Sequence, residues 1–285
     1  MITPIHIDSN AEITPAFGTH ALPQGREILR LKAAQSGPSK FGKWRISYYR
    51  KRALRGLTPP FDVEIEADLK ARLYPHGNRC EKRAVAGVQI WDAQERAYMK
   101  AAINAAQSDF TFLDVGANVG LYSLYAAFYA QGAGRKIHIH AIEPDRENAR
   151  RLMDNAGANG FALTLWPAAI SDTVGEVSLQ PHPDNRGEIK LSGTVNGEAI
   201  KVTTLAQIIN QSALKHIDLL KLDIEGHDLR ALTHLFENLD PSLYPHHLII
   251  ETAAPDDIPL TTLCYNMGYV VKGRSRLNLM LMRDN

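Results

Sequence analysis

From residue 110 onward, short apolar runs alternate with longer amphipathic segments. The runs at 110–115, 136–142, 161–170, 217–224 and 247–251 have the length and composition of buried strands. The segments at 119–129, 146–155, 229–239 and 258–267 have apolar positions at helical spacing. Strands alternating with helices predict an α/β fold, with a mostly parallel sheet and helices on both faces. Two last apolar runs, GYVVKG and LNLMLMR, predict an antiparallel C-terminal hairpin.

Composition divides the chain into three segments. Residues 1–60 begin with forty positions rich in Pro, Gly, Ser and Thr, which predict a loosely ordered N-terminal arm. Residues 61–108 contain short strand-like runs and a helical pattern over 91–106. Residues 109–285 hold the alternating pattern and are the expected ligand-binding domain, into which GEVSLQP and EIKLSG insert a further hairpin.

The end of the N-terminal segment is strongly basic. Lys40 to Arg55, KFGKWRISYYRKRALR, contains seven Lys and Arg residues and no acidic one, with Trp44, Tyr48 and Tyr49 among them. Such a helix suits the surface of an anionic membrane or an acidic glycan. The alternative is a solvated helix whose aromatic side chains pack on the main domain.

Bulk properties exclude several classes of protein. The 285 residues are 45% hydrophobic and 22% charged, which is ordinary for a globular protein with a sizeable core. A formal net charge of +1 argues against general electrostatic binding of nucleic acid. The two cysteines, Cys80 and Cys264, show neither zinc spacing nor a disulfide framework. With no signal peptide at the start and no apolar run long enough to span a bilayer, we expect a cytoplasmic protein.

The first strand of the alternating region ends in an unusual loop, FLDVGANVG, at residues 112–120. Gly116 and Gly120 can take positive φ and let backbone N–H groups approach a ligand closely. The helix that follows points its positive end at a bound anion. Asp114, just before the loop, is placed to accept hydrogen bonds from an ammonium group or from loop amides. The loop therefore predicts a ligand-binding turn.

The second strand ends in AIEPD, which places Glu143 at the strand terminus. An acid at this position typically accepts the hydroxyls of a ribose. Together with the glycine loop, it predicts an adenosine-containing cofactor. A nicotinamide dinucleotide would require G-x-G-x-x-G, whereas Asn118 occupies the central glycine position. The carboxylate of Asp114 suits a ligand with a free amino group, which favours S-adenosylmethionine.

Five blocks of the sequence resemble FkbM-type S-adenosylmethionine-dependent methyltransferases: FLDVGANVGLYSL, AIEPDRENARRL, AAISDTVGEVSL, DLLKLDIEGHDLRAL and LIIE. The resemblance implies a class I methyltransferase fold with a Rossmann-like sheet, and methyl transfer most often to a hydroxyl oxygen. It also implies that Glu143 holds the ribose, that Ala168 lies by the adenine, and that the cofactor loop is formed by Asp114, Gly116, Ala117, Asn118 and Gly120. It does not extend to the long N-terminal part or the inserted hairpin, where we expect acceptor choice to lie.

KLDIEG, at the end of the fourth predicted strand, contains the two candidate catalytic residues Asp223 and Glu225. Residues two apart in a strand share a face, so both carboxylates can point into one cleft. An aliphatic hydroxyl needs a base or a metal to help remove its proton. Asp223 or Glu225 can be that base, or both can hold a divalent cation, with Glu251 at the fifth strand's end as a third carboxylate.

The sequence thus predicts an enzyme that transfers a methyl group from S-adenosylmethionine to a hydroxyl of a saccharide or secondary metabolite. Two alternatives remain: an NAD(P)-dependent oxidoreductase and a non-catalytic cofactor-binding module. The acceptor, the need for a metal and the oligomeric state cannot be read from the sequence.

Overall fold

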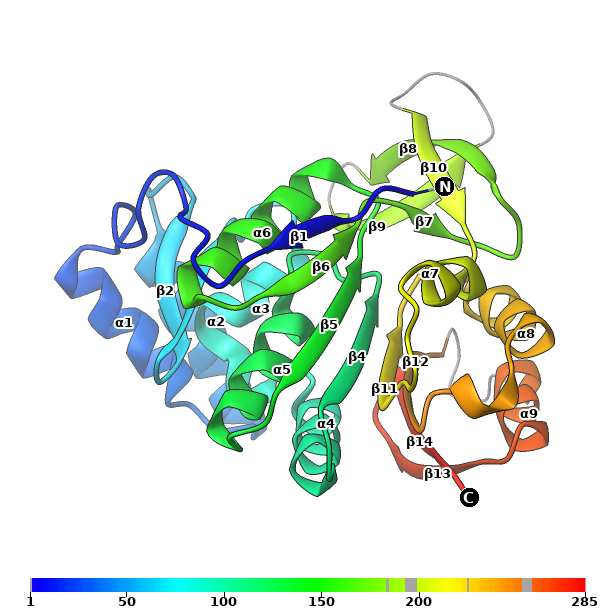
Figure 1. The fold of residues 1–285 in the computed structure, drawn as a ribbon. Helices are drawn as coiled ribbons and strands as arrows, with labels where there is room; N and C mark the ends of the chain where they lie inside the picture. Colours follow the sequence, from blue (N-terminus) through cyan, green and yellow to red (C-terminus); the bar gives the residue numbers. More distant parts are fainter. Residues whose placement is uncertain (1, 183–184, 193–198, 225, 253–257, 285) are drawn as a thin grey trace.

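A computed structural model describes residues 2–182, 185–192, 199–224, 226–252 and 258–284. Its centre is an eight-stranded sheet (Figure 1). In spatial order the strands are β1 (Ile5–Ile7), β6 (Leu163–Trp166), β5 (Ile137–Ile142), β4 (Phe110–Val115), β11 (Leu219–Leu222), β12 (His247–Glu251), β14 (Asn278–Arg283) and β13 (Tyr269–Arg274). The five strands from β6 to β12 are parallel, whereas β1, β14 and β13 pair antiparallel with their neighbours. This confirms the predicted fold class and the C-terminal hairpin.

Helices cover both faces of the sheet (Figure 1). One face carries α4 (Ala93–Ala105), α5 (Leu121–Gly132) and α6 (Arg146–Asn159), and the other carries α7 (Leu205–Gln211), α8 (Asp228–Asn238) and α9 (Ile258–Asn266). The strands supply both interfaces because successive side chains alternate between the two faces. In β4, Phe110 and Phe112 belong to one hydrophobic cluster, whereas Leu113 and Val115 belong to the other. Two short 3₁₀ helices complete the helical elements: η1 (Val88–Ile90) and η2 (Pro241–Leu243).

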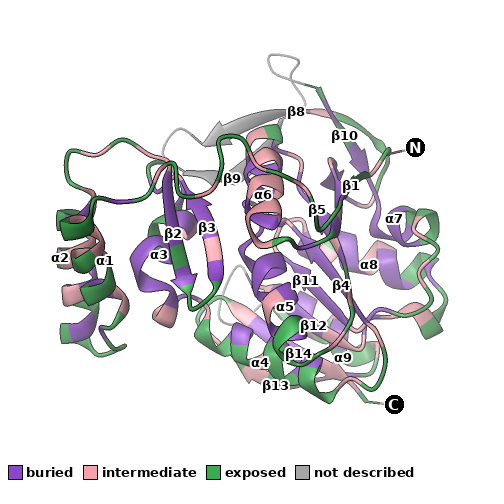
Figure 2. Cartoon of the chain, turned by 60° about the vertical axis from the view of Figure 1, so that its left-hand side comes forward, coloured by how far each residue is buried: buried purple, intermediate pink, exposed green. Residues whose placement is uncertain are grey.

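The N-terminal part is more ordered than the sequence suggested. Its elements are β1, α1 (Gln24–Ala34), α2 (Lys40–Leu54), the antiparallel pair β2 (Phe61–Glu66) and β3 (Leu69–Leu73), and α3 (Arg79–Gly87). The N-terminal segment is therefore not the loosely ordered arm that we expected. Strand β1 adds an edge strand to the main sheet, and α1 packs against α2 and α3 (Figure 2). Ala33 of α1, Phe61 of β2 and Phe112 of β4 lie in one hydrophobic cluster. The three expected segments therefore share a core.

The predicted strand over 161–170 is two strands in two sheets. Pro167 follows β6 and cannot donate a ladder hydrogen bond, so the chain leaves the main sheet there. It continues as β7 (Ala169–Ile170) in a second sheet of order β7-β10-β8-β9. The predicted hairpin is confirmed as β8 (Gly175–His182) and β9 (Asn185–Ser192), and β10 (Ala199–Thr203) returns the chain beside β7.

Candidate functional site

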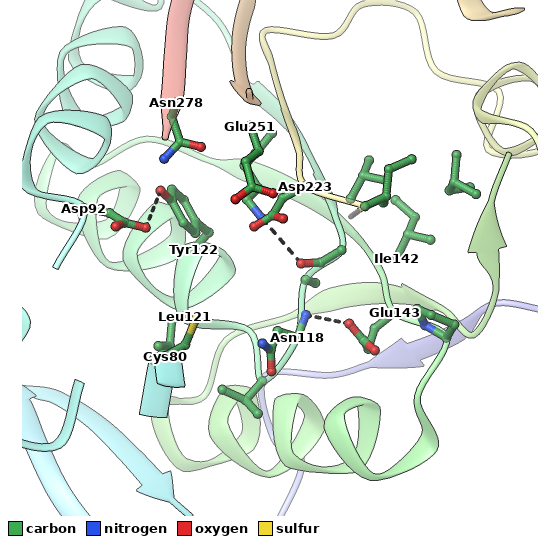
Figure 3. Close-up of a pocket in the computed structure, with 18 of the residues that line it drawn as sticks. Cys80, Asp92, Asn118, Leu121, Tyr122, Ile142, Glu143, Asp223, Glu251 and Asn278 are labelled. Atoms are coloured by element: carbon green, nitrogen blue, oxygen red, sulfur yellow. Dashed lines mark hydrogen bonds and ion pairs between the residues drawn. The ribbon is translucent and has the colours of Figure 1, made fainter. Parts of the chain in front are cut away.

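A pocket opens at the carboxyl ends of the central strands (Figure 3). Parallel strands in register bring their ends to one edge of the sheet: Val115 of β4 lies opposite Ile142 of β5 and Leu222 of β11. Four groups of residues line the cavity. The first two groups are the loop 115–119 and the strand ends 142–144 and 168–170. The third comes from β11, β12, β14 and the segments beside them: Lys221, Asp223, Ile224, Glu251, Leu277 and Asn278. The fourth lies in or next to the helices: Arg79, Cys80, Arg83, Trp91, Asp92, Leu121 and Tyr122.

The loop after β4 is held in left-handed backbone conformations. Gly116, Asn118 and Gly120 have φ values of 74°, 52° and 81°. Asn tolerates this region better than most residues because its short polar side chain bonds locally, here by accepting from Asn78 Nδ2 at 2.9 Å. The left-handed residues delay the helix, so α5 begins at Leu121 and not at the expected Val119. Ala117 and Asn118 form part of the cavity wall, and the binding of a cofactor by this loop remains a prediction.

Glu143 lies beside this loop at the end of β5 (Figure 3). Its carboxylate accepts the backbone N–H of Asn118 at 2.7 Å and that of Asp145 at 2.9 Å. Burial raises the pKa of Glu143 to about 7, although both hydrogen bonds act in the opposite direction. Each carboxylate oxygen has a second lone pair, so the side chain can still accept hydrogen bonds from a ligand. Ala168, predicted to lie by an adenine, is fully buried on the same wall.

Asp114 lies behind the cavity wall. Its carboxylate accepts the N–H and the hydroxyl of Ser123 at 3.1 Å and 2.7 Å, which ties β4 to α5. The side chain is fully buried, and burial raises its pKa above the usual range despite the nearby Lys221. Its other oxygen is buried without a hydrogen-bond partner among the described residues. The predicted contact of Asp114 with a ligand's amino group remains a prediction.

The main polar feature of the pocket is an ion pair that the sequence analysis did not identify. Lys221 and Asp223 are two residues apart on β11 and its extension, and Lys221 Nζ lies 3.0 Å from Asp223 Oδ2. Lys221 is buried, with Nζ 3.4 Å from the carbonyl oxygen of Gly116 and 5.2 Å from the centre of the Tyr122 ring. Burial alone would lower the pKa of Lys221, but the carboxylates of Asp223 and Asp114 raise it, so the amine stays charged.

Asp223 is partly exposed to the cavity, where the Glu251 carboxyl group lies beside it (Figure 3). Burial would raise the pKa of Asp223, but the Lys221 ammonium and the contact with Glu251 hold it below its usual range. Glu251 ends β12 and pairs in register with Asn278 of β14, whose amide donates to Glu95 Oε1 at 2.8 Å. Asp223 and Glu251 thus line the same pocket.

Glu225, the second candidate catalytic residue, lies outside the described residues. Among the described residues no three His, Cys, Asp or Glu side chains are grouped as metal ligands. Asp172 accepts hydrogen bonds from Arg230 Nε at 3.0 Å and Nη2 at 2.8 Å and does not line this pocket.

The N-terminal helices complete the pocket opposite the strand ends. Arg79, Cys80 and Arg83 come from α3, and Asp92 precedes α4 in a left-handed conformation with φ 42°. Asp92 accepts the hydroxyl of Tyr122 at 3.0 Å, and burial raises the pKa of this carboxyl above its usual range. These residues precede the glycine loop by 24–37 positions and have no local signature, so only the fold places them here.

The chain is similar to several known proteins. The family described as the methyltransferase FkbM domain matches residues 114–269, and the chain belongs to this family. Hexuronic acid methyltransferase AglP of Haloferax volcanii is 24% identical over 148 residues, covering 50% of this chain and 59% of that protein. The 31-O-demethyl-FK506 methyltransferase FkbM of Streptomyces tacrolimicus is 26% identical over 170 residues, covering 48% of this chain and 64% of that protein. The matches thus span less than two thirds of either relative.

Among solved structures, the METTL16 methyltransferase domain has a TM-score of 0.51 and 11% identity, covering 90% of this chain and 88% of that domain. At this identity the likeness is one of fold.

Proposed function

We propose that the protein transfers a methyl group from S-adenosylmethionine to a hydroxyl oxygen of a saccharide or secondary metabolite. The observation that carries the proposal is the Asp223 carboxylate, paired with Lys221 and exposed to a cavity that also contains the cofactor loop and Glu143. Family membership supports methyl transfer over the nicotinamide alternative. The relatives' names describe methyl transfer to a hexuronic acid and to 31-O-demethyl-FK506, which supports a hydroxyl-bearing acceptor.

The residues of the pocket suit this cofactor. Gly116 and Asn118 offer backbone at positive φ beside the cavity, where a ligand can approach without obstruction by a side chain. Glu143 would accept the ribose hydroxyls, and Ala168 would contact the adenine. Asp114 would act on the amino group indirectly, by holding the loop and α5 in place through its bonds to Ser123. When bound, the cofactor supplies a methyl group on a cationic sulfur that leaves as a neutral thioether, so the chemistry has one proton to remove.

Asp223 is our candidate for removing that proton. When the acceptor hydroxyl is methylated, the Asp223 carboxylate would take the hydroxyl proton and become a carboxylic acid. Lys221 keeps Asp223 ionised beforehand, because its ammonium lies 3.0 Å away. Glu251 lies beside this carboxylate and, in its protonated form, would donate a hydrogen bond that orients it. Glu225 remains a second candidate base from the same motif.

The polar groups opposite Asp223 indicate the kind of acceptor. Arg79, Asp92, Tyr122 and Asn278 line this part of the cavity and come from four different elements. Such convergent donors and acceptors suit a polyhydroxylated molecule, which needs many directed hydrogen bonds.

Methyl transfer by Asp223→Asn, Glu225→Gln and Glu251→Gln tests the proposal. Loss of a general base typically slows the reaction about 10²–10⁴-fold. We expect Asp223→Asn to fall in this range while calorimetry shows nearly unchanged cofactor binding. Asp172→Asn is the matched control, because this acid is paired with Arg230 outside the pocket. Wild-type turnover by Asp223→Asn with the true acceptor would remove Asp223 from the mechanism.

A chelator tests whether the reaction needs a divalent metal ion. If Glu225, Asp223 and Glu251 hold a divalent cation, a chelator abolishes wild-type activity and Mg²⁺ or Mn²⁺ restores it. If the chelator has no effect while Asp223→Asn is slow, the base mechanism stands.

Binding and turnover separate the three functional alternatives. We expect purified protein to bind S-adenosylmethionine and not NADH, and Asn118→Gly not to create NADH binding, because the loop has no seat for a pyrophosphate. Tight NADH binding by the wild type contradicts the proposal. Cofactor binding without turnover on any acceptor favours a non-catalytic module.

A further inference from the structure

The outward face of α2 is apolar and basic at the same time. The helix buries Gly42, Ile46 and Ala53 against the rest of the molecule. On the opposite side it exposes Phe41 by 66% and Trp44 by 58% of their surfaces, with Tyr48 also exposed. Solvent contact at aromatic side chains of this size is costly unless a partner covers them. The neighbouring helix α1 adds exposed Ile28 and Leu31 at the same end of the molecule (Figure 2).

The aromatic rings on α2 stack on one another. Phe41 and Trp44 have ring centres 5.7 Å apart and planes inclined by 19°, and Trp44 and Tyr48 have centres 5.3 Å apart and planes inclined by 15°. Arg45 lies over the Phe41 ring and Arg52 over the Tyr48 ring. Sugars and bases bind by stacking on ring faces, and here neighbouring rings and guanidinium groups occupy faces. The exposed rings of Phe41, Trp44 and Tyr48 therefore lie next to one another along the outward face of α2.

The positive charge of α2 indicates which kind of partner this face binds. The segment Lys40 to Arg55 contributes seven positive charges and no negative one, while the whole chain has a net charge of only +1. The rest of the protein is therefore net acidic, and the positive charge is concentrated on this helix. Basic side chains around exposed Trp and Phe are typical of helices that lie in the headgroup region of a bilayer. Among the described helices none is long and apolar enough to cross one.

We propose that this face of α2 binds the surface of an anionic lipid bilayer. Phe41 and Trp44 insert at the boundary between headgroups and acyl chains, and Lys40, Lys43, Lys51, Arg52 and Arg55 contact the lipid phosphates. The opposite side of α2 contacts the helix that forms one wall of the pocket: Arg50 Nη1 donates to the carbonyl of Lys82 on α3 at 3.1 Å, and Arg83 on α3 lines the cavity. The inference does not depend on the proposed reaction.

Tryptophan fluorescence tests insertion directly. The chain has three tryptophans, and Trp91 and Trp166 are buried, so Trp44 is the one open to solvent. The full chain is mixed with vesicles of phosphatidylcholine alone or with added phosphatidylglycerol. We expect the anionic vesicles to shift Trp44 emission to shorter wavelength, protect it from aqueous quenchers and expose it to brominated lipid. No change with anionic vesicles overturns the proposal.

Co-sedimentation with the same vesicles measures affinity. We expect salt to weaken binding, and each of Lys40→Gln, Lys43→Gln and Lys51→Gln to weaken it about fivefold. Phe41→Ser with Trp44→Ser should abolish insertion. The controls are Tyr265→Ser and Lys201→Gln, which alter exposed side chains on α9 and β10 and should bind as the wild type.

Three other results would contradict the proposal. The first is equal loss of binding in the α2 variants and the controls. The second is stronger binding to an acidic polysaccharide than to the anionic vesicles, lost in the α2 variants, which assigns the face to a glycan. The third is a lipid-free dimer that Phe41→Ser and Trp44→Ser dissociate, which assigns it to a second copy of the chain.

Discussion

Gly116 lies directly against the backbone carbonyl of Asp223. A Cβ atom at Gly116 would be 1.9 Å from that oxygen, well inside van der Waals contact. The glycine therefore serves two purposes: it permits positive φ, and it lets the cofactor loop sit on the strand end that carries the candidate base. The two halves of the site are packed backbone to backbone, so a displacement of one moves the other.

Gly116→Ala should damage both halves. The control is Gly134→Ala, which has a similar φ of 61° but no atom within 4 Å of its added Cβ. An L-residue at positive φ costs about 1–2 kcal/mol, so we expect that loss in Gly134→Ala. Gly116→Ala should lose more free energy of unfolding and also bind S-adenosylmethionine poorly. Denaturant titration and calorimetry measure the two effects. Equal losses in the two variants would show that the contact with Asp223 is unimportant.

Lys221→Met should move the acidic limb of the pH–rate profile. In the proposed reaction the base is ionised Asp223, so activity should fall as the pH drops through its pKa. Without the ammonium, burial raises that pKa, and the fall should begin at a higher pH than in the wild type. Lys221→Arg retains the charge and should keep the limb nearer its original position. The measurement is kcat across pH, and an unmoved limb in Lys221→Met would contradict the role given to this pair.

Glu143 should make cofactor binding depend on pH near neutrality. Glu143→Ala is expected to weaken S-adenosylmethionine binding by about 1.5–3 kcal/mol, the range for hydrogen bonds to a charged group. Because burial raises the pKa of Glu143 to about 7, the carboxylate protonates as the pH falls through this value and accepts hydroxyls less well. Wild-type affinity should decline over that range, whereas Glu143→Gln should be flat. Calorimetry on both sides of pH 7 decides, and wild-type affinity in Glu143→Ala would remove the ribose assignment.

Two adjacent arginines on α6 should differ in their contribution to stability. Arg151 Nη1 lies 2.8 Å from the buried Glu81 carboxylate of α3, whereas the more exposed Arg150 pairs with Glu147 and Asp154. Breaking a buried pair costs about 3–5 kcal/mol, and an exposed pair contributes about 0–1 kcal/mol. Arg151→Met should therefore unfold far more easily than Arg150→Met in denaturant.

The deficit of Arg151→Met should also grow with pH. Burial raises the pKa of Glu81 to about 7 even with Arg151 present. A raised folded-state pKa stabilises the fold at low pH, where the carboxyl is protonated, and this stabilisation is lost as the pH rises through the folded-state value. Removing Arg151 leaves the ionised form without its partner, so the loss is largest above pH 7. A pH-independent deficit would indicate that Arg151 acts through packing alone.

The sequence predicted local features well and distant contacts poorly. The apolar runs at 110–115 and 247–251 predicted the observed limits of β4 and β12, because a strand buried in the sheet needs apolar side chains along most of its length. Pro167 was visible, but the switch to a second sheet depends on β10, which lies more than thirty residues later. Lys221 shares its strand face with Asp223, so period-two spacing could have identified it. Its burial could not be predicted, because a lysine is normally exposed.

The helical wall of the pocket was beyond sequence reasoning for a different reason. Arg79, Cys80 and Asp92 face the strand ends only because α3 and α4 pack on that side. Nothing in their own neighbourhood indicates a ligand. The helical wall of the pocket thus depends on long-range contacts, whereas the loop wall comes from one contiguous segment, residues 115–119.

The edge strand β1 is synthesised long before its partner strand and can be placed only after that strand has formed. Its partner β6 lies about 160 residues further along the chain, with Ile5 opposite Leu165. During translation the outer edge of β6 therefore forms when residues 5–7 have long since left the ribosome. Until residues 5–7 pair with β6, the growing sheet has an unpaired edge strand that can pair with other chains, which is a known route to aggregation. Truncating the first seven residues should consequently reduce soluble yield more than it reduces the activity of the protein that does fold.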